Sequence, residues 1–199
     1  MARKVSGLAK IDGAAVRVIG RRGFARASTR QIAHAAGVSE GLIFRYYKTK
    51  LDLGRRLFQR HYHDVLSLLK AEAARHADPL VTLGEVAKTF YRWFDEDRDI
   101  GQFLLRSHQE FLETVDEDQG ILWLAGRALR GILGEAVFGL LPGDILAAMV
   151  VGAFVQVATE CMHGQVKGPL GPRMAPVIDS LVGFLKERGQ APFPAGEGA

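Results

Sequence analysis

The sequence predicts an all-α protein of about nine helices, with an N-terminal three-helix domain that contains a helix-turn-helix and a larger helical domain after it. Two observations lead to this fold class. Apolar side chains recur three and four positions apart in one segment after another, which is the helical period. No stretch shows a convincing strand, and glycine, proline or cap-forming residues separate the helical segments.

The first helix is predicted over residues 6–22, behind a mobile arm at 1–5. Its apolar residues share one face at helical spacing, namely Leu8, Ile11, Ala15, Val18 and Ile19. Gly23 ends this helix, and Phe24 is expected to fill the small core that it forms with the next two helices.

Residues 28–50 have the pattern of a helix-turn-helix. Ser28 or Thr29 caps a second helix, because a hydroxyl accepts a hydrogen bond from an unpaired N–H at a helix start. Gly37 ends that helix in a left-handed turn, and Ser39 is the cap candidate for a third helix. In such a pair the second helix lies in the DNA major groove.

Helical patterns continue to residue 188. They span about 50–75, 80–97, a segment capped by Asp99, 118–141, a segment capped by Asp144 and running to 163, and 173–188. We expect three regions: a helix-turn-helix DNA-binding domain at 1–49, a helical effector-binding and dimerisation domain at 50–190, and a flexible Pro/Gly-rich tail at 191–199.

Composition is that of an ordinary soluble globular protein. Of its 199 residues, 48% are hydrophobic and 24% are charged. The single cysteine, Cys161, excludes an internal disulfide framework and fits a reducing compartment. The N-terminus lacks the apolar run of a secretory signal, and the most apolar stretch, 145–155, is shorter than a bilayer requires. We therefore expect a cytoplasmic protein that does not enter a membrane.

Charge is distributed unevenly along the chain. Residues 1–63 hold 14 basic side chains against three acidic ones, a net charge of +11. The remaining residues hold 12 basic and 19 acidic side chains, a net charge of −7. A basic segment attached to an acidic body is typical of a protein whose basic part binds a polyanion such as nucleic acid.

The N-terminal part closely resembles the DNA-binding domain of the tetracycline-repressor (TetR) family of transcriptional regulators. The resemblance rests on RRGF at 21–24, STRQIAHAAGVSEGLIFRYYKTK at 28–50, and Leu53 after it. By motif it covers about a third of the chain, and the rest is similar only in length and helical character. It implies a regulator that binds a palindromic operator in double-stranded DNA as a homodimer, most often a repressor released by a small effector.

The resemblance also implies DNA contacts at matching positions. Arg30 is expected to grip guanine O6 and N7, with a phosphate contact as the alternative. Ser28, Thr29 and Lys50 are expected to bind phosphates, and Glu40 to accept a hydrogen bond from cytosine. The predicted DNA-binding residues are Ser28, Thr29, Arg30, Ser39, Glu40, Gly41, Leu42, Phe44, Arg45, Lys48 and Lys50.

Three residues depart from the family pattern. Phe44 stands where the family usually has a tyrosine, so a phosphate contact through a phenol hydroxyl cannot form. Lys48 replaces a frequent proline and is expected to supply a phosphate contact by charge. Leu42 is bulkier than the usual small residue and is expected to touch a thymine methyl group, so a relative's operator cannot be transferred.

An effector cavity, implied by the resemblance, would lie among the middle helices. Its predicted walls and polar anchors are Phe90, Trp93, Phe94, Phe103, Leu104, Arg106, His108, Trp123, Phe138, Gln156 and Glu160. Because few of these side chains carry a fixed charge, a hydrophobic or amphipathic effector is favoured. For each aromatic residue, plain core packing is the alternative.

The last two predicted helices hold more apolar residues than one helix face needs. In the family these helices pair with their copies in a second subunit. The predicted dimer interface consists of Leu146, Met149, Val150, Phe154, Val157, Val177, Ile178, Leu181 and Phe184. Completion of the monomer core is the alternative.

We expect neither an enzyme nor a cofactor or metal. The sequence lacks a phosphate-binding glycine loop and the motifs G-x-S-x-G and H-E-x-x-H. His61 and His63 are two positions apart, so they diverge on a helix and do not form a metal pair. Two regulatory alternatives remain open: redox sensing through Cys161, and a DNA-binding dimer without an effector.

Overall fold

The computed structural model describes residues 7–115, 120–134 and 142–188, and every regular element within these ranges is helical. The nine α-helices of these ranges are α1 (Gly7–Arg22), α2 (Thr29–Ala36), α3 (Glu40–Tyr46), α4 (Lys50–Ala73), α5 (Pro79–Glu96), α6 (Arg98–Phe111), α7 (Ile121–Leu133), α9 (Gly143–Met162) and α10 (Leu170–Arg188), with a 3₁₀ turn, η1 (Leu112–Thr114), after α6. The predicted all-α fold is confirmed. The predicted mobile arm at 1–5 and tail at 191–199 lie outside the described residues.

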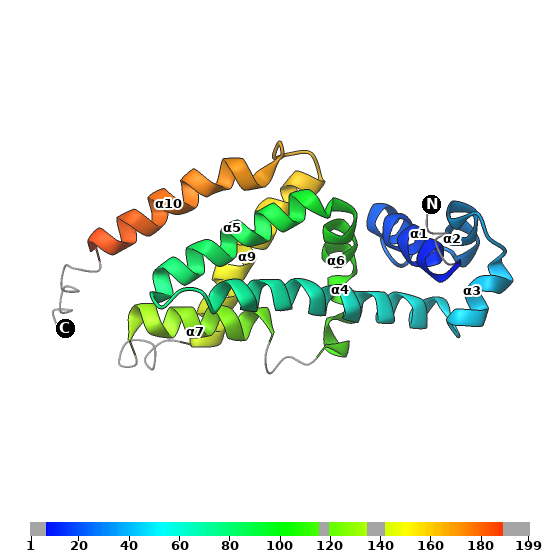
Figure 1. Cartoon of the computed structure of the whole chain (residues 1–199), viewed down its shortest axis with the longest axis horizontal. Helices are drawn as coiled ribbons and strands as arrows, with labels where there is room; N and C mark the ends of the chain where they lie inside the picture. The colour runs from blue at the N-terminus through cyan, green and yellow to red at the C-terminus, as the bar shows by residue number, and fades with distance from the viewer. Residues whose placement is uncertain (1–6, 116–119, 135–141, 189–199) are drawn as a thin grey trace, which may run out of the picture.

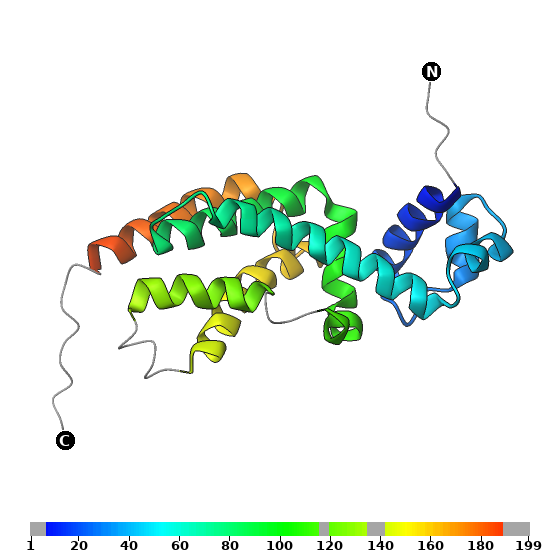
Figure 2. The same ribbon diagram turned by 60° about the horizontal axis from the view of Figure 1, so that its bottom comes forward.

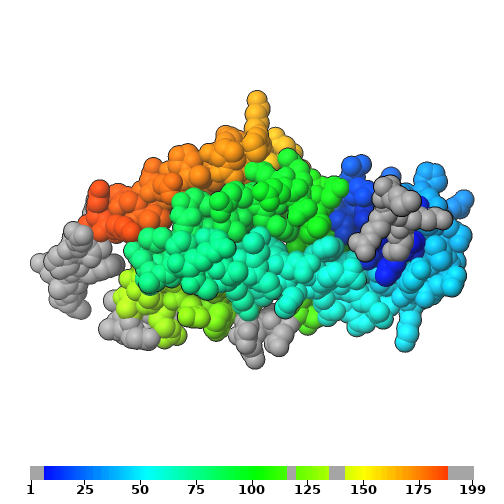
Figure 3. Space-filling view, in the orientation of Figure 1, coloured from blue at the N-terminus to red at the C-terminus, as the bar shows by residue number. Residues whose placement is uncertain are grey.

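The helices α1, α2 and α3 form one end of an elongated molecule, and the remaining helices form its body (Figures 1 and 2). Helix α4 begins at that end and runs along the body, where α5 packs against it. Helix α10 packs along α5, and α7 packs against α9. In the space-filling view, α4, α5 and α10 form successive layers of one face (Figure 3). Helix α4 is therefore the covalent link between the two ends.

Helix α10 begins three residues earlier than the sequence pattern predicts. The carboxylate of Asp95, on α5, accepts hydrogen bonds from the backbone N–H groups of Leu170 and Gly171 at 2.9 and 2.6 Å. Such a carboxylate satisfies donors that have no partner within the helix and complements the positive end of the helix dipole. A side chain 75 residues away in the chain thus sets this helix start.

Other helix ends also differ from the prediction. Asp97 rather than Asp99 occupies the N-cap of α6, and Pro142 rather than Asp144 occupies that of α9. Helix α7 covers only the middle of the predicted 118–141 segment, because Gly134 leaves the helical conformation with φ 76°. The remaining predicted turns, at 135–141, lie outside the described residues.

Two hydrophobic clusters form the core of the described residues. The larger one joins buried residues of α1, α2, α3 and α4 to Phe103, Leu104 and Phe111 of α6. The smaller one joins α5 to α9 and α10 through residues such as Tyr91, Phe94 and Ile178. Because the larger cluster continues from the N-terminal helices into the body, the predicted domain boundary at residue 49 stays a prediction.

Two glycines allow the N-terminal helices to approach the body closely. A Cβ on Gly20 of α1 would lie 3.2 Å from the backbone nitrogen of Phe103 and 3.3 Å from the carbonyl oxygen of Asp99, both on α6. A Cβ on Gly54 of α4 would lie 2.7 Å from the ring of Phe24 and 2.8 Å from that of Phe111. Any other residue at either position would push α6 away from α1 or α4.

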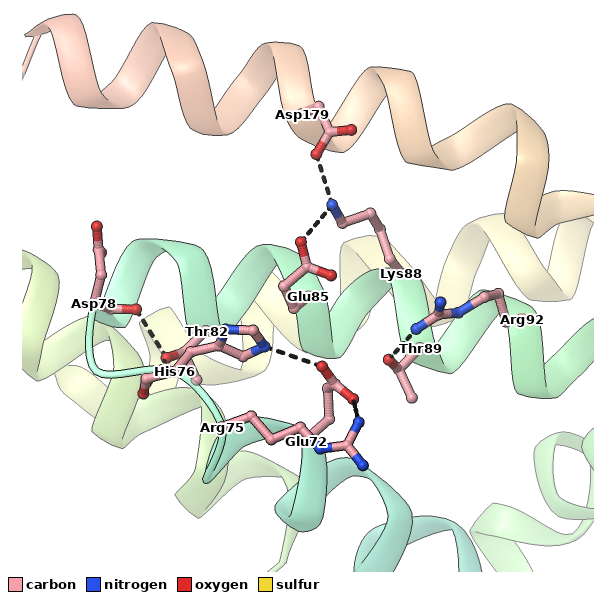
Figure 4. A network of polar contacts seen from close by, with 10 residues as sticks. All are labelled: Glu72, Arg75, His76, Asp78, Thr82, Glu85, Lys88, Thr89, Arg92 and Asp179. Atoms are coloured by element: carbon pink, nitrogen blue, oxygen red, sulfur yellow. Dashed lines mark hydrogen bonds and ion pairs between the residues drawn. The ribbon is translucent and has the colours of Figure 1, made fainter.

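Ion pairs on the surface of the body attach α10 to α5. The ammonium of Lys88 lies 2.6 Å from the carboxylate of Glu85 and 2.7 Å from that of Asp179, which hold the pKa of Lys88 above its ordinary value (Figure 4). The ammonium of Lys186 lies 3.1 Å from the carboxylate of Asp78, and this pairing lowers the pKa of Asp78. These exposed contacts orient α10, while apolar packing supplies most of its stability.

Helix α9 is the most apolar element and one of the least buried. By length and composition it could cross a membrane, yet only 17% of its most apolar stretch is buried within the chain. The expectation that the sequence holds no stretch of sufficient length is therefore wrong, since the helix continues well beyond the apolar run at 145–155. Much of its apolar surface is therefore left uncovered by the rest of the described chain.

Candidate DNA-binding surface

The helix-turn-helix is shaped by its own cap and turn residues. The hydroxyl oxygen of Ser28 accepts a hydrogen bond from the backbone N–H of Gln31 at 3.2 Å, and the side chain of Gln31 accepts one from the N–H of Ser28 at 3.1 Å. Gly37 has φ 66°, and its N–H reaches back to the carbonyl of His34 at 3.2 Å. The predicted cap and the predicted left-handed turn are both confirmed.

Helix α3 is anchored through one face. Ile43 and, just after the helix, Tyr47 are only 0% and 3% exposed. Ser39 occupies the N-cap, but its side chain makes no capping hydrogen bond, unlike the prediction. The opposite side is exposed, and together with the start of α2 it forms the candidate DNA-binding surface. Its exposed members are Ser28, Arg30, Ser39, Glu40, Gly41, Phe44, Arg45 and Lys48.

Gly41 leaves open space on this surface. A Cβ built on it would meet no described atom within 4 Å, and its φ is not positive. Glycine inside a helix costs about 1 kcal/mol relative to alanine. Neither packing nor backbone conformation among the described residues requires a glycine here, and its small size leaves the surface open to the close approach of a partner.

Thr29 and Glu40 are hydrogen-bonded to each other across the turn. The hydroxyl of Thr29 donates to Oε1 of Glu40, which joins α2 to α3. While it does so, Thr29 has no proton left for a phosphate oxygen, which only accepts. The predicted phosphate contact of Thr29 is therefore not supported. Glu40 keeps a second carboxylate oxygen that can accept from an amino group of a base.

Lys50 serves the fold rather than the surface. Its ammonium donates to the carbonyl oxygens of Phe24 and Ala27, each at 3.0 Å, and lies 4.4 Å from the centroid of the Phe24 ring. These two bonds hold the α1–α2 connection against α4 and use two of the three ammonium protons, so the phosphate contact of Lys50 stays a prediction. The motif identified the residue but not its partner.

Leu42 is also partly used within the protein. Its side chain is half-buried against the larger core cluster, and its Cδ2 lies 3.3 Å from the place of a Cβ on Gly7. This contact explains why a bulky residue is accommodated here. It also reduces the apolar area available for the predicted contact with a thymine methyl group.

A basic hollow adjoins the surface between the end of α1 and the start of α2. It has a volume of about 460 Å³ and is lined by Val18, Arg22, Ser28, Arg30, Gln31 and His34. The sequence motif does not single out Arg22, Gln31 and His34, although the excess of basic residues before residue 63 indicates this region. The concave shape and the two guanidinium groups suit a phosphate of a DNA backbone.

Comparisons with known proteins agree with this geometry. Residues 13–57, from α1 to the first turns of α4, match the model of the family described as bacterial regulatory proteins, tetR family. This match covers the helix-turn-helix and the helices that hold it.

The chain carries the DNA-binding domain of the TetR family of transcriptional regulators. It is a DNA-binding regulator and not an enzyme.

Solved structures of other regulators share the fold over nearly the whole chain. The fatty acid degradation regulator FadR from Bacillus halodurans is 25% identical with a TM-score of 0.72, and the match covers 92% of this chain and 98% of that one. FadR from Bacillus subtilis in complex with stearoyl-CoA is 22% identical with a TM-score of 0.69, over 88% and 96%. A TetR-like transcriptional regulator from Rhodococcus sp. RHA1 is 21% identical with a TM-score of 0.68, over 97% and 100%.

Among the described residues, the predicted effector-binding residues divide between the two core clusters and the surface. Phe94 is fully buried in the smaller core cluster, while Phe103 and Leu104 are buried in the larger one. Phe90 and Trp93 contact both clusters and so mark the seam between them. The predicted wall residue Phe138 lies outside the described residues.

The predicted polar anchors lie on the surface. Arg106, His108 and Gln156 are exposed, and the amide of Gln156 donates to the carboxylate of Glu160 at 2.6 Å, one turn along α9. Trp123 is 41% exposed, with Arg127 at 4.9 Å and Lys70 at 5.8 Å from its ring centroid. In this conformation these side chains face outward rather than a shared interior space, and their contact with an effector stays a prediction.

The predicted interface residues divide into two groups. Met149, Val177, Leu181 and Phe184 are exposed, between 50% and 66%. Leu146, Val150, Phe154 and Val157 are half-buried, and the last two pack against the smaller core cluster. Ile178 is only 3% exposed and lies against α5 near Gly84, so its assignment to an interface is wrong. On α10 it faces inward while its neighbour Val177 faces outward.

Cys161 is buried in the smaller core cluster, 2% exposed. The guanidinium of Arg98 donates to its carbonyl oxygen at 3.3 Å and to its Sγ at 3.5 Å. A redox sensor needs a thiol that oxidants can reach. This burial favours a structural role for Cys161 over the redox alternative.

Proposed function

We propose that the protein is a homodimeric repressor that binds a palindromic operator and is released from it by an amphipathic effector with a long apolar chain. One observation supports this most strongly: a basic, outward-facing helix-turn-helix stands at one end of a molecule whose two last helices expose apolar side chains. The helix-turn-helix can bind DNA, and the exposed apolar side chains of the last two helices can bind a second protein surface. Such a regulator acts at the chromosome, in the cytoplasm.

A second copy of the chain is the partner that best fits the exposed apolar faces of α9 and α10. Exposed apolar side chains occur on both helices, with Ile145 and Met149 on α9 and Leu181, Phe184 and Leu185 on α10. Helix α10 also carries the exposed charges of Asp179 and Lys186, which would be costly inside a bilayer. Stable dimers bury about 800 Å² on each partner. Helices α9 and α10, with 20 and 19 residues, offer two long apolar surfaces for such an interface.

A dimer explains how short reading helices achieve affinity. One α3 has seven residues and reaches only a few base pairs. Two copies related by a twofold axis read two half-sites about one helical turn apart, and so select a palindrome. We propose that three side chains contact base edges, namely Arg30, Glu40 and Arg45. We propose that four others contact the phosphate backbone of the DNA, namely Ser28, Lys48, Arg22 and His34.

The effector class is proposed from the seam between the two core clusters. Phe90 and Trp93 lie there, and an apolar chain inserted between the clusters would separate α5 from α4 and α6. Similarity to the FadR proteins, one of them solved with stearoyl-CoA, supports a fatty acyl thioester of coenzyme A. A ligand that binds only the separated state shifts the population toward it and away from DNA.

An operator selected from random duplex DNA provides the test. We expect the selected sequence to be palindromic, and long-chain acyl-CoA to release the protein from it in a fluorescence anisotropy titration. The same ligand should stabilise the free protein by about 2.7 kcal/mol at one hundred times its dissociation constant. Free coenzyme A serves as the control for binding through the headgroup alone.

A pair of tryptophan variants locates the effector. Trp93→Ala should weaken release by acyl-CoA, whereas Trp123→Ala, at the exposed surface, should leave it unchanged. Equal effects of both variants would contradict binding at the seam. If no acyl-CoA stabilises the protein or releases it from the operator, a DNA-binding dimer without this effector is the better description. Failure to enrich any DNA sequence would overturn the repressor itself.

A further inference from the structure

Three polar side chains meet where the N-terminal helices join the body: Asp12 of α1, Tyr47 at the end of α3, and Arg60 of α4. The phenol hydroxyl of Tyr47 donates to Oδ1 of Asp12 at 2.6 Å. A guanidinium nitrogen of Arg60 donates to Oδ2 of the same carboxylate at 2.9 Å. We call this set the Asp12 clamp, because one carboxylate holds two other helical elements.

The two donors of the Asp12 clamp keep their protonation states near neutral pH. Tyr47 is only 3% exposed, and burial, together with the Asp12 carboxylate, raises the pKa of its hydroxyl above the ordinary value. The same carboxylate raises the pKa of Arg60. Tyr47 therefore stays a neutral donor and Arg60 a charged donor across the physiological pH range.

The hydroxyl of Tyr47 is not needed for packing or for DNA. A phenylalanine would fill the same buried space, and a buried hydroxyl costs free energy unless it is hydrogen-bonded. The side chain faces the core, away from the candidate DNA-binding surface, so it cannot contact a base or a phosphate. What the hydroxyl adds is a directional bond that ties the end of the reading helix to α1.

The clamp continues into contacts with the body. His61, the neighbour of Arg60 on α4, lies edge-on to the ring of Phe103 on α6, with centroids 6.3 Å apart. Gly20 of α1 approaches the backbone of the same Phe103. A rotation of α4 relative to α6 would therefore move Arg60 and Asp12, and with them Tyr47.

A small cavity beside the clamp leaves room for such a rotation. It has a volume of about 230 Å³ and is lined by Asp12, Gly13, Val16, Arg17, Arg60, His61, Asp99 and Ile100. Elsewhere the N-terminal helices are tightly packed, with Ile11, Ile19, Ile32 and Ile43 fully buried. Because this cavity lies between α1, α4 and α6, the bonds of Asp12 to Arg60 and Tyr47, rather than close apolar packing, join α1 to α4 and to the end of α3 at this point.

We propose that the Asp12 clamp is a positioning device that sets the angle between the reading helix and α4, and thereby the spacing of half-sites that the dimer accepts. This inference rests on the proposed dimer on a palindrome. In a twofold dimer, the angle of each reading head relative to α4 determines the separation of the two α3 helices. A firmly held angle accepts one spacing, whereas a loosened one accepts several.

The test compares operators that differ only in the spacer between identical half-sites. The probes are the selected operator and versions with one or two base pairs added to or removed from its centre. The variants are Tyr47→Phe, which removes only the hydroxyl, and Asp12→Asn, which keeps an acceptor for Tyr47 but removes the charge facing Arg60. Tyr91→Phe is the matched control, since that buried hydroxyl donates to the carbonyl of Phe154 in the body at 3.1 Å.

Wild-type protein should bind one spacing best and lose affinity at every other. In Tyr47→Phe the loss on shifting the spacing should shrink by about three- to tenfold, the range that one net hydrogen bond supplies. Binding to a single half-site should not change, and Tyr91→Phe should keep the wild-type profile. A loss of affinity shared by all spacings would indicate a merely structural role.

An unchanged spacing profile in both Tyr47→Phe and Asp12→Asn would overturn the inference and leave the proposed dimer intact. If Tyr47→Phe does not fold, as judged by circular dichroism, Asp12→Asn decides alone. A wild-type protein that tolerates every spacing equally would overturn both the inference and the proposed palindromic dimer.

Discussion

The N-terminal end and the body of this protein differ in how directly their sequence describes their structure. At the N-terminal end, short helices are separated by residues with one conformational role, such as Gly37 in its left-handed turn. In the body, long helices carry apolar residues on more than one face, and contacts distant in sequence choose which face is buried. Local chemistry shapes the first region, whereas packing shapes the second.

The largest effect is expected from charged residues placed in the proposed dimer interface of the body. Met149→Asp combined with Phe184→Asp places carboxylates where we propose that two copies meet. We expect a monomer by light scattering and a loss of operator affinity of at least about a hundredfold, because each half-site is then bound alone. Leu122→Asp is the matched control, since Leu122 is an exposed apolar residue, 47%, on α7. A dimer that survives the double substitution would contradict the proposed interface.

Lys50→Met tests whether this motif residue serves the fold or DNA. Removing the ammonium leaves two carbonyl oxygens without their donor, so we expect the free energy of unfolding to fall by about 1–3 kcal/mol. The slope of log affinity against log salt should not change. Lys48→Met, at an exposed position, should do the reverse, with normal stability and a slope smaller by about one. A reduced slope in Lys50→Met would restore the phosphate contact.

Arg30→Ala tests whether α2 contacts a base as well as phosphates. If the guanidinium grips guanine, specific binding should weaken by about 1–3 kcal/mol and discrimination should relax at one base pair of each half-site. Competition among operators with single substitutions measures this. Equal weakening on every sequence would show that Arg30 contacts only phosphate.

Glu40→Gln tests which base the Glu40 carboxylate contacts. A carboxylate accepts from the amino group of cytosine, whereas glutamine pairs with adenine N6 and N7. Selection from random DNA should therefore change a cytosine to an adenine at one position of each half-site. Tighter binding to all sequences would instead show that Glu40 acts only by repelling phosphates.

The smallest effect that we predict is a dependence of stability on pH through His61. Burial lowers the pKa of this imidazole below its ordinary 6.5 in the folded protein, although Asp64 opposes the shift. The unfolded chain then binds a proton first as pH falls, so stability should decline below about pH 6.5 towards the folded pKa. Thermal unfolding between pH 7.5 and 5.5 should show a weaker decline in His61→Gln than in wild type.

Particular residues show where sequence analysis worked. Ser28 and Gly37 were predicted as cap and turn because a hydroxyl at a helix start and a glycine at a helix end each have one common use. Ile11, Ala15 and Ile19 are buried on the predicted apolar face of α1, because the helical period leaves few alternatives. Over this stretch, near neighbours in the chain are also near neighbours in space.

Lys50, Thr29 and Ile178 show where it failed. The sequence indicates a cation after α3, but not that the carbonyls of Phe24 and Ala27 bind it. It indicates a hydroxyl in α2, but not that Glu40 accepts its proton. It indicates an apolar α10, but not which of two adjacent residues packs against Gly84. In each case the partner lies on another segment of the chain, either a different helix or the α1–α2 connection.

By itself, then, the sequence determined the helical class, the helix-turn-helix with its caps, the basic end and the family. These follow from the period of apolar residues, the conformational preferences of single residues and a long motif. Only the tertiary structure decided which polar groups remain free for DNA, which aromatic residues are core, and that Asp12 joins α1, α3 and α4. The reason is physical: a side chain's role depends on the partner that it meets, and helix packing brings together residues with no pattern in common along the chain.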